Sequence, residues 1–423
     1  MPNIRSNRTA AVVFIFITVT LDMLAFGIVI PVLPKLVEQF MHGDTARAAE
    51  MYGLMVTLWA FMQFVFSPVL GALSDRFGRR PVILLSCFGL GLDFILMALA
   101  PNLTWLFIAR AISGLTSANM TTAGAYIADV TPPEKRAAAF GVIGAAFGVG
   151  FVLGPALGGL LGGIDLRFPF WAAAVLCLLN AVYGFFILPE SLPPEKRAAF
   201  SWKRANPVGS LVLLRSHPEL FGLATSNFLG QLAHVVLPST AVLYMTYRYG
   251  WSALIIGLTL AGVGVAALIV QGVLVKPIVG RLGEQRTLIM ALLFGTAGFT
   301  IYGLAPTPIL FWLGVPVMSF WGLAMPTSQS LMTQHVSASE QGQLQGANSS
   351  LTGIAGLIGP VLFTYTFATF IGPRANLHLP GAPFLLAAAM LALSAFIAWR
   401  ATRARHAPAS EVEMPRTRSH INR

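Results

Sequence analysis

The chain has 423 residues, of which 56% are hydrophobic and 10% are charged, and its mean hydropathy is +0.74. A soluble protein of this length needs far more charge to cover its surface, so a soluble globular protein is excluded and lipid must face much of the chain. The net charge of +11 is interpreted as a sign of membrane orientation, and no nucleic-acid partner is expected.

Apolar windows of about 20 residues, the length that spans a bilayer, follow one another along the whole sequence. The first set of predicted spans covers 10–34, 51–73, 81–100, 103–128, 137–162 and 168–188. The second set covers 218–246, 252–279, 287–305, 308–334, 343–371 and 382–400. The predicted fold class is therefore an all-α membrane protein with twelve transmembrane helices in two six-helix bundles.

The sequence divides into two bundles, a linker and a tail. The N-terminal bundle covers 1–188 and the C-terminal bundle 218–400, and the proline-containing, charged segment 189–217 is predicted to be a linker. Residues 401–423 form a polar, basic segment that is predicted to be disordered. With the N-terminus placed in the cytoplasm, 21 of the 27 Lys and Arg residues fall on the cytoplasmic side, so both termini are predicted to be cytoplasmic.

Charged groups inside the predicted spans are few. Asp22 lies midway through span 1, Asp93 lies in span 3, and Arg110 lies in span 4. A carboxylate at the centre of a span costs at least ~2.5 kcal/mol, so each carboxylate is a functional candidate. Arg110 cannot lose its proton and must find a carboxylate, carbonyl groups or water. A structural pair with Arg110 is the alternative for Asp22, and Asp93 is either structural or functional.

Span 7 carries polar residues at helical spacing. Asn227, Gln231 and His234 are separated by four and three residues, so they share one helix face. His234 is the histidine that lies well inside a span, and it is the candidate for a second titrating group. Gln63, Gln271 and Gln329 are predicted to add hydrogen bonds to a substrate. Trp59, Phe64 and Trp321 either stack on a planar substrate or pack in the core or against lipid.

The two halves of the sequence resemble each other at an offset of 205 residues. The pair Gly154-Pro155 returns as Gly359-Pro360, and Gly78 returns as Gly283. Asp22 corresponds to Asn227 at the same offset. Each half contains six spans and so enters the membrane from the same side. This predicts a parallel repeat of the kind found in two-bundle transporters, which bind substrate between the bundles near the middle of the membrane.

The predicted loop between spans 2 and 3 combines two glycines, a carboxylate and three guanidinium groups. Its residues are Gly71, Asp75, Arg76, Gly78, Arg79 and Arg80. Two glycines permit a tight turn, and the charges can latch neighbouring helix ends as a cytoplasmic gate. The loop resembles the signature between spans 2 and 3 of the major facilitator superfamily. An ordinary positively charged cytoplasmic loop is the alternative.

Span 5 is dense in small residues, which let helices approach closely. They include Gly150, Gly154, Pro155, Gly158 and Gly159. The pattern resembles the antiporter motif of drug exporters in this superfamily, which implies export. A plain packing helix is the alternative.

Further segments resemble the tetracycline-resistance branch of proton-coupled drug exporters. They are 21–34 in span 1, 58–63, 86–93, 109–114 and 340–346. The resemblance implies a bacterial inner membrane and places Asp22 in the cavity as a proton or substrate partner. Arg110, whose charge would act on a nearby Asp22, and His234, as a titrating group in the second half, are further proton-coupling candidates from the residues themselves. In the best-known members, span 8 carries a histidine and span 9 an aspartate, and these positions fall on Ala267 and Gly295 here.

The predicted function is a secondary transporter that exports an amphiphilic, planar drug in exchange for protons. A proton-coupled metabolite importer of the same fold is the alternative. An enzyme is not expected, because no nucleophile–base constellation is present, and Cys87 and Cys177 lack metal-binding spacing. No cofactor is predicted, although a tetracycline would arrive as a divalent-metal chelate. The predicted partners are the substrate, protons and the lipid bilayer, and the predicted state is a monomer.

Overall fold

The computed structural model describes residues 4–403 except 117–118, 133–134, 201–205, 207, 217, 338–339, 374 and 376. Every regular element in this described part is a helix. Eleven helical segments in it are long and apolar enough to cross a membrane. The remaining predicted span, 103–128, coincides with α5 (Leu103–Thr116), a shorter apolar helix, and with α6 (Asn119–Val130). The chain is thus a multi-pass helical membrane protein, as the sequence predicted.

Helices of the first half follow the predicted spans closely. Besides α5 and α6 they are α1 (Ile4–Val29), α2 (Leu33–Phe40), α3 (Thr45–Phe77), α4 (Arg79–Leu99), α7 (Arg136–Gly162) and α8 (Phe168–Ile187). A three-residue turn at 30–32, which includes Pro31, separates α1 from α2 within the first span. In the linker the structure describes short turns at Pro194–Lys196 and Gly209–Leu211 and the helix α9 (Val212–Ser216).

In the second half, several spans consist of more than one helix. The helices are α10 (Pro218–His234), α11 (Val236–Tyr249), α12 (Ala253–Ile269), α13 (Val275–Leu282), α14 (Glu284–Leu304), α15 (Pro308–Ser319), α16 (Ala324–Thr333), α17 (Gln341–Ile371) and α18 (Ala382–Arg403). Helix α18 extends three residues beyond the predicted span, and the rest of the predicted tail, 404–423, lies outside the described residues.

The internal repeat is visible in the helices themselves. Helices α4 and α14 both contain 21 residues, and their bounds differ by the same 205 positions at both ends. Each begins directly after a glycine with positive φ, 107° at Gly78 and 75° at Gly283. A side chain would be strained in this conformation, which explains glycine at both positions. Pro155 and Pro360, also 205 apart, both lie inside helices, α7 and α17.

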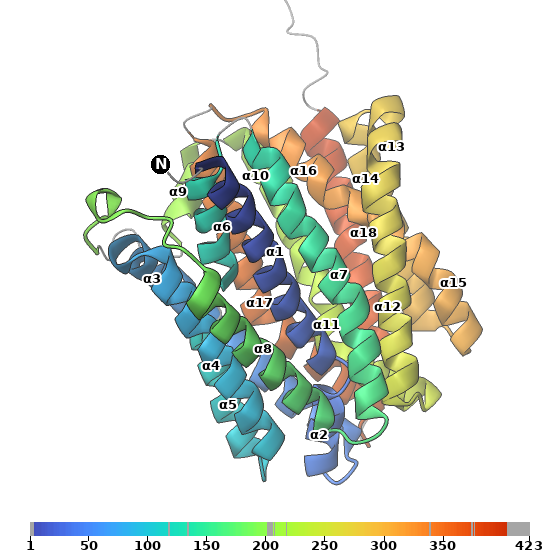
Figure 1. Cartoon of the computed structure of the whole chain (residues 1–423). Helices are drawn as coiled ribbons and strands as arrows, with labels where there is room; N and C mark the ends of the chain where they lie inside the picture. Colours follow the sequence, from blue (N-terminus) through green and yellow to red (C-terminus); the bar gives the residue numbers. More distant parts are fainter. Residues whose placement is uncertain are drawn as a thin grey trace, which may run out of the picture.

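The helix ends define two faces of the molecule. The loop face carries Gly78, the linker and Gly283, and the far face carries the turns at 41–44, 163–167 and 250–252 (Figure 1). Helix α7 lies between α1 of its own half and α12 of the other half (Figure 1). Helix α3 packs along α17. These two contacts join the halves.

Candidate functional site

A cavity of about 340 Å³ opens inside the second half. Asn227, Gln231 and His234 line it from α10, and Gln271 lines it from the span of α12 and α13. These four were predicted to contribute to a substrate cavity or to proton coupling, and the structure brings them together around one space. Trp321 and Thr352, on the spans of α15–α16 and α17, belong to the same wall, as do the hydroxyl residues Ser226 and Ser328.

Three interruptions of regular helix meet at this cavity. The seventh span breaks between His234 and Val236, where α10 ends and α11 begins. The eighth span contains a π-helical turn at Val270–Leu274, which carries Gln271, and the tenth contains a 3-10 turn at Phe320–Leu323, which carries Trp321. Irregular backbone at membrane depth is tolerated where it lines a cavity, and π-helical turns frequently mark functional sites. Each interruption thus supplies one side chain to the wall.

The indole of Trp321 forms the aromatic side of the cavity. Its centroid lies 5.7 Å from that of the His234 ring and 5.5 Å from that of the Phe299 ring. Gly295 makes this position possible, because a Cβ at residue 295 would lie 2.8 Å from Cγ of Trp321. Position 295 is therefore packed directly against the indole. This role of Trp321 depends on the rotation of the tenth span, which the sequence leaves open.

A chain of carboxamides holds Asn227 at the cavity wall. Asn227 donates to Oδ1 of Asn348 at 3.2 Å, and Asn348 donates to Oε1 of Gln329 at 2.8 Å. Gln329 in turn donates to Oε1 of Gln345 at 2.8 Å. Gln329 was predicted to face a substrate, but it acts in the structure as a support for Asn348 and is not among the residues that line the cavity. Asn348 was missed because a single carboxamide gives no sequence signal.

The predicted cavity residues of the first half lie elsewhere. Gln63 is half-buried on α3 and is not part of the lining of this cavity. Near it, Phe64 packs against Gly353 of α17, and the ring of Trp59 stacks on Phe26 at 6.1 Å between centroids. These two aromatic residues therefore serve packing in the described structure.

Asp22 lies in the interior of the first half and not at the cavity in the second. Its side chain is buried and accepts a hydrogen bond of 3.1 Å from Nδ2 of Asn180 on α8. The same nitrogen approaches Sγ of Cys87 on α4 at 3.6 Å. Asp22 is thus bonded to α8, and Asn180 is a partner that the sequence did not identify.

Arg110 forms an ion pair with Asp93. The distance from its guanidinium nitrogen to Oδ2 of Asp93 is 3.3 Å, and both side chains are buried. The same nitrogen lies 3.2 Å from Sδ of Met97. The partner of Arg110 is therefore the carboxylate of span 3, and Asp93 has at least a structural role.

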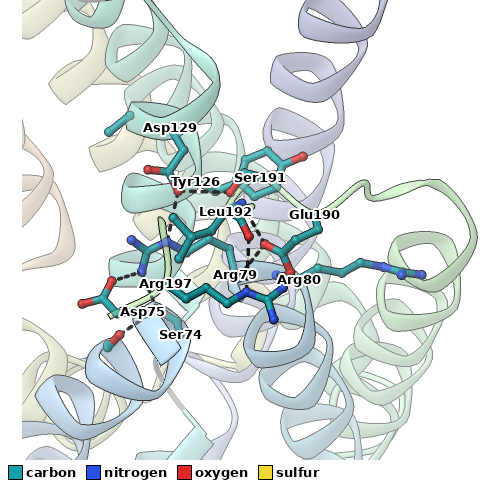
Figure 2. A network of polar contacts seen from close by, with 12 residues as sticks. Ser74, Asp75, Arg79, Arg80, Tyr126, Asp129, Glu190, Ser191, Leu192 and Arg197 are labelled. Atoms are coloured by element: carbon teal, nitrogen blue, oxygen red, sulfur yellow. Dashed lines mark hydrogen bonds and ion pairs between the residues drawn. The ribbon is translucent and has the colours of Figure 1, made fainter. Parts of the chain in front are cut away.

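The loop signature forms a polar network at the loop face (Figure 2). Arg79 binds two carboxylates, Asp75 at 2.5 Å and Asp129 at 3.1 Å. The carboxylate of Glu190, just after α8, accepts from the backbone nitrogens of Arg79 at 2.8 Å and of Arg80 at 3.3 Å. It therefore caps the N-terminus of α4, where a negative charge is favourable.

The remaining loop residues have separate positions. Ser191 donates to Asp129 at 3.1 Å (Figure 2). Arg80 donates to the carbonyl oxygen of Phe185 at 2.6 Å. Arg76 is exposed, with its guanidinium over the ring of Phe77. The prediction that Gly71 contributes to the turn is wrong, because Gly71 lies inside α3 and Gly78 alone takes the positive φ.

The glycines of α7 have two packing partners. On one side, Gly150, Gly154 and Gly158 pack against α1, where a Cβ at residue 154 would lie 2.6 Å from Cα of Gly27. On the other side, Gly159 packs against α12 of the other half, with a Cβ position 2.5 Å from the Ala253 carbonyl oxygen. Gly257 of α12 rests on the Pro155 carbonyl group. These small residues thus allow one helix to contact both halves.

Comparisons with known proteins agree with this architecture. Residues 15–360 match the Major Facilitator Superfamily. The chain is 40% identical over 367 residues to the tetracycline resistance protein, class C, of Escherichia coli, a match that covers 86% of this chain and 91% of that protein. It is 36% identical over 371 residues to the class G protein of Vibrio anguillarum, with coverages of 86% and 92%.

Solved structures share the fold. The human organic anion transporter MFSD10 (TETRAN) has a TM-score of 0.68 at 25% identity, covering 94% of this chain and 100% of that one. An inward-facing bacterial homologue of the human lysosomal transporter Spinster has a TM-score of 0.74 at 17% identity, covering 94% and 97%. The chain therefore belongs to the Major Facilitator Superfamily, in the branch of the tetracycline resistance proteins, and is a secondary transporter and not an enzyme.

Proposed function

We propose that this transporter exports an amphiphilic, planar drug from the cytoplasm of a bacterium in exchange for protons. The observation that carries the proposal is the cavity at the three helix interruptions, which offers a flat ring and several neutral hydrogen-bonding groups to one small molecule. The similarity to tetracycline resistance proteins favours export over import of a metabolite. The excess of Lys and Arg in the termini and loops of one side favours an inner-membrane orientation with the loop face in the cytoplasm.

In this orientation the described contacts between the halves near the far face would close the outer side of the transporter. Lys35 donates to the carbonyl oxygen of Trp251 at 2.7 Å, and Tyr52 donates to that of Pro238 at 3.1 Å, so the halves are joined near the far face. On the loop-face half of α3, Gly71 has no atom within 4 Å of its Cβ position. Drug would enter from the cytoplasm, and rocking of the halves would break the far-face contacts and release it outside.

Asp22 is the proposed proton carrier. It accepts a hydrogen bond from the neutral amide of Asn180, and the ion pair of Arg110 goes to the other buried carboxylate, Asp93. The Asn180 amide suits both protonation states: its Nδ2 donates to the carboxylate, and its Oδ1, which is buried and has no hydrogen-bond partner in the described structure, can accept from the protonated acid. His234 is the second candidate, since an imidazole changes charge between about pH 5 and 8.

Everted membrane vesicles test the proposal. Energised vesicles that contain the protein should accumulate tetracycline, release protons when the drug is added, and stop when a protonophore is present. Asp22→Asn should fold normally, because the new amide can still accept from Asn180, yet it should not accumulate the drug. Asp44→Asn is the matched control, because asparagine can also cap the helix that begins at Thr45. Drug uptake in vesicles of the opposite orientation, or undiminished accumulation by Asp22→Asn, would contradict the proposal.

A further inference from the structure

The chemical character of the cavity indicates which form of cargo it takes. Fifteen described residues line it, and none of them is Asp, Glu, Lys or Arg. Its polar groups are carboxamides, hydroxyls and one imidazole. Divalent cations such as Mg²⁺ are held by oxygen ligands, above all carboxylates, when a protein binds them directly. The wall thus contains no charged group that would favour the positive charge of a metal chelate.

Gly295 leaves no room for a side chain, because its Cβ position lies 2.7 Å from Cδ1 of Leu391 and 2.8 Å from Cγ of Trp321. The space belongs to the indole, which His234 and Phe299 hold from two sides. Where a carboxylate would attract a cation, the cavity presents an aromatic surface.

The hydrogen-bonding groups are fixed close to this aromatic surface. Gln271 reaches the 3-10 turn, since its Nε2 lies 3.2 Å from the Cβ position of Gly322, the residue next to Trp321. Asn227 donates its amide to Asn348, so its own carbonyl oxygen can accept from a ligand. Donors and acceptors therefore surround a flat ring, as recognition of a neutral, polar aromatic molecule requires.

We propose that the cargo binds in this cavity as a planar aromatic molecule free of metal, with a ring against the Trp321 indole and its polar edge on Gln231, Gln271 and Asn227. This inference rests on the proposed function and names the class of substrate. It separates the chain from a carrier of metal chelates, because recognition comes from an aromatic face and neutral amides, with no contribution from a bound cation.

Equilibrium binding to the purified protein, without any ion gradient, tests the inference. Two probes are titrated: tetracycline, which chelates Mg²⁺, and acridine, which is planar and does not. Each titration is run with EDTA and with excess Mg²⁺. Tetracycline should bind in EDTA, and Mg²⁺ should weaken its apparent affinity in proportion to the fraction of drug chelated. Acridine should bind equally in both conditions.

Variants assign the binding to the cavity. Trp321→Ala should weaken both probes by about tenfold, whereas Trp321→Phe, which keeps a flat ring, should stay within about threefold of the wild type. Trp399→Ala removes a partly exposed tryptophan of α18 that does not line the cavity, and it should have no effect. Gly295→Ala displaces the indole and should weaken binding. Gly262→Ala, at a position with no atom within 4 Å of its Cβ, is its control.

Three outcomes would overturn the inference: tetracycline binding that requires Mg²⁺, binding of neither probe to the wild type, or wild-type affinity in Trp321→Ala. Because binding is measured without a gradient, its result is independent of the vesicle experiment. Metal-free binding without proton-driven accumulation would reject the proposed function alone. Proton-driven accumulation of tetracycline together with a strict Mg²⁺ requirement would reject this inference alone.

Discussion

The interiors of the two halves contain different kinds of polar groups. The first half buries charge: Asp22 against Asn180, and Asp93 against Arg110. The second half holds neutral carboxamides around a cavity. Asp22 and Asn227 occupy the same position of the 205-residue repeat, yet Asp22 bonds to α8, in the sixth span, and Asn227 to α17, in the eleventh.

This difference separates two tasks that one transporter must perform. A buried charge has to be paired, and its pairing fixes the packing around it, so the first half is suited to hold groups that respond to protons. Neutral amides can exchange partners at lower cost, so the second half is suited to accept a ligand. The two repeats have therefore diverged in chemistry while keeping the same helices.

The largest effect is expected when the buried ion pair of the first half is broken. Arg110→Leu leaves the Asp93 carboxylate without a counter-charge, which should lower the free energy of unfolding by ~3–5 kcal/mol. The double variant Arg110→Leu with Asp93→Leu removes both charges and should recover most of that loss. Thermal unfolding of the purified protein measures both. Equal melting temperatures for the single and double variants would contradict the prediction, because the unpaired Asp93 carboxylate would then carry no cost.

The second prediction concerns the contact that couples the halves. A methyl group at Gly257 would overlap the carbonyl oxygen of Pro155, and backbone atoms cannot turn aside. Gly257→Ala should therefore make closure of the far face less favourable by ~1–3 kcal/mol and reduce the transport rate about tenfold. Spin labels at residues 47 and 248, both exposed, should report a longer distance across that face. An unchanged distance in this variant, with Gly262→Ala as control, would contradict the prediction.

A smaller effect is expected from the amide chain of the second half. Asn348→Ala removes the acceptor of Asn227 and the donor to Gln329, which should weaken tetracycline or acridine binding about fivefold, or ~1 kcal/mol. Stability should change little, because no charge is left unpaired. Ser349→Ala, which removes a hydroxyl that bonds within the same helix, is the control. A large loss of stability in Asn348→Ala would mean that the neutral network is structural, like the charged pair of the first half.

The smallest effect is expected at the loop face. Glu190→Gln removes the charge that caps α4, which should cost ~0.3–1 kcal/mol and lower the melting temperature slightly. Glu195→Gln changes an exposed linker carboxylate and serves as the comparison. If both variants melt alike, the cap of Glu190 does not contribute to the stability of the first half.

Much of this fold follows from the sequence, because apolar spans, glycine positions and repeats can be recognised in the linear order of the residues. Predicted limits such as 168–188 match α8 to one residue, and the glycines of α7 pack closely as expected. The shared helix face of Asn227, Gln231 and His234 also follows from spacing alone, and the structure places all three at the cavity.

The features that the sequence did not predict depend on the rotation of helices about their axes and on local breaks in regular helix. From the sequence, Arg110 could form an ion pair with Asp22 or with another carboxylate. Only the relative rotation of α4 and α5 selects Asp93 as its partner. Asn180 gave no signal, since one asparagine in an apolar helix is unremarkable until its partner is known. The π-helical turn at Val270–Leu274 contains Gly272 and is followed by Pro277, which cannot donate to the carbonyl group of Val273. These residues indicate a local break in the helix, but they do not specify a π-helical turn or the direction in which Gln271 enters the cavity.

The hydrogen bonds of Lys35 and Tyr52 near the far face can be removed by mutation in one half of the chain more readily than in the other. Both side chains belong to the first half, and both bond to main-chain carbonyl oxygens of the second half, at Trp251 and Pro238. A codon change can delete a side chain, but it cannot delete a carbonyl group. Selection for variants that have lost these two bridges should therefore return replacements at residues 35 and 52. For these two bridges, the side chains that mutation can remove all come from the first repeat.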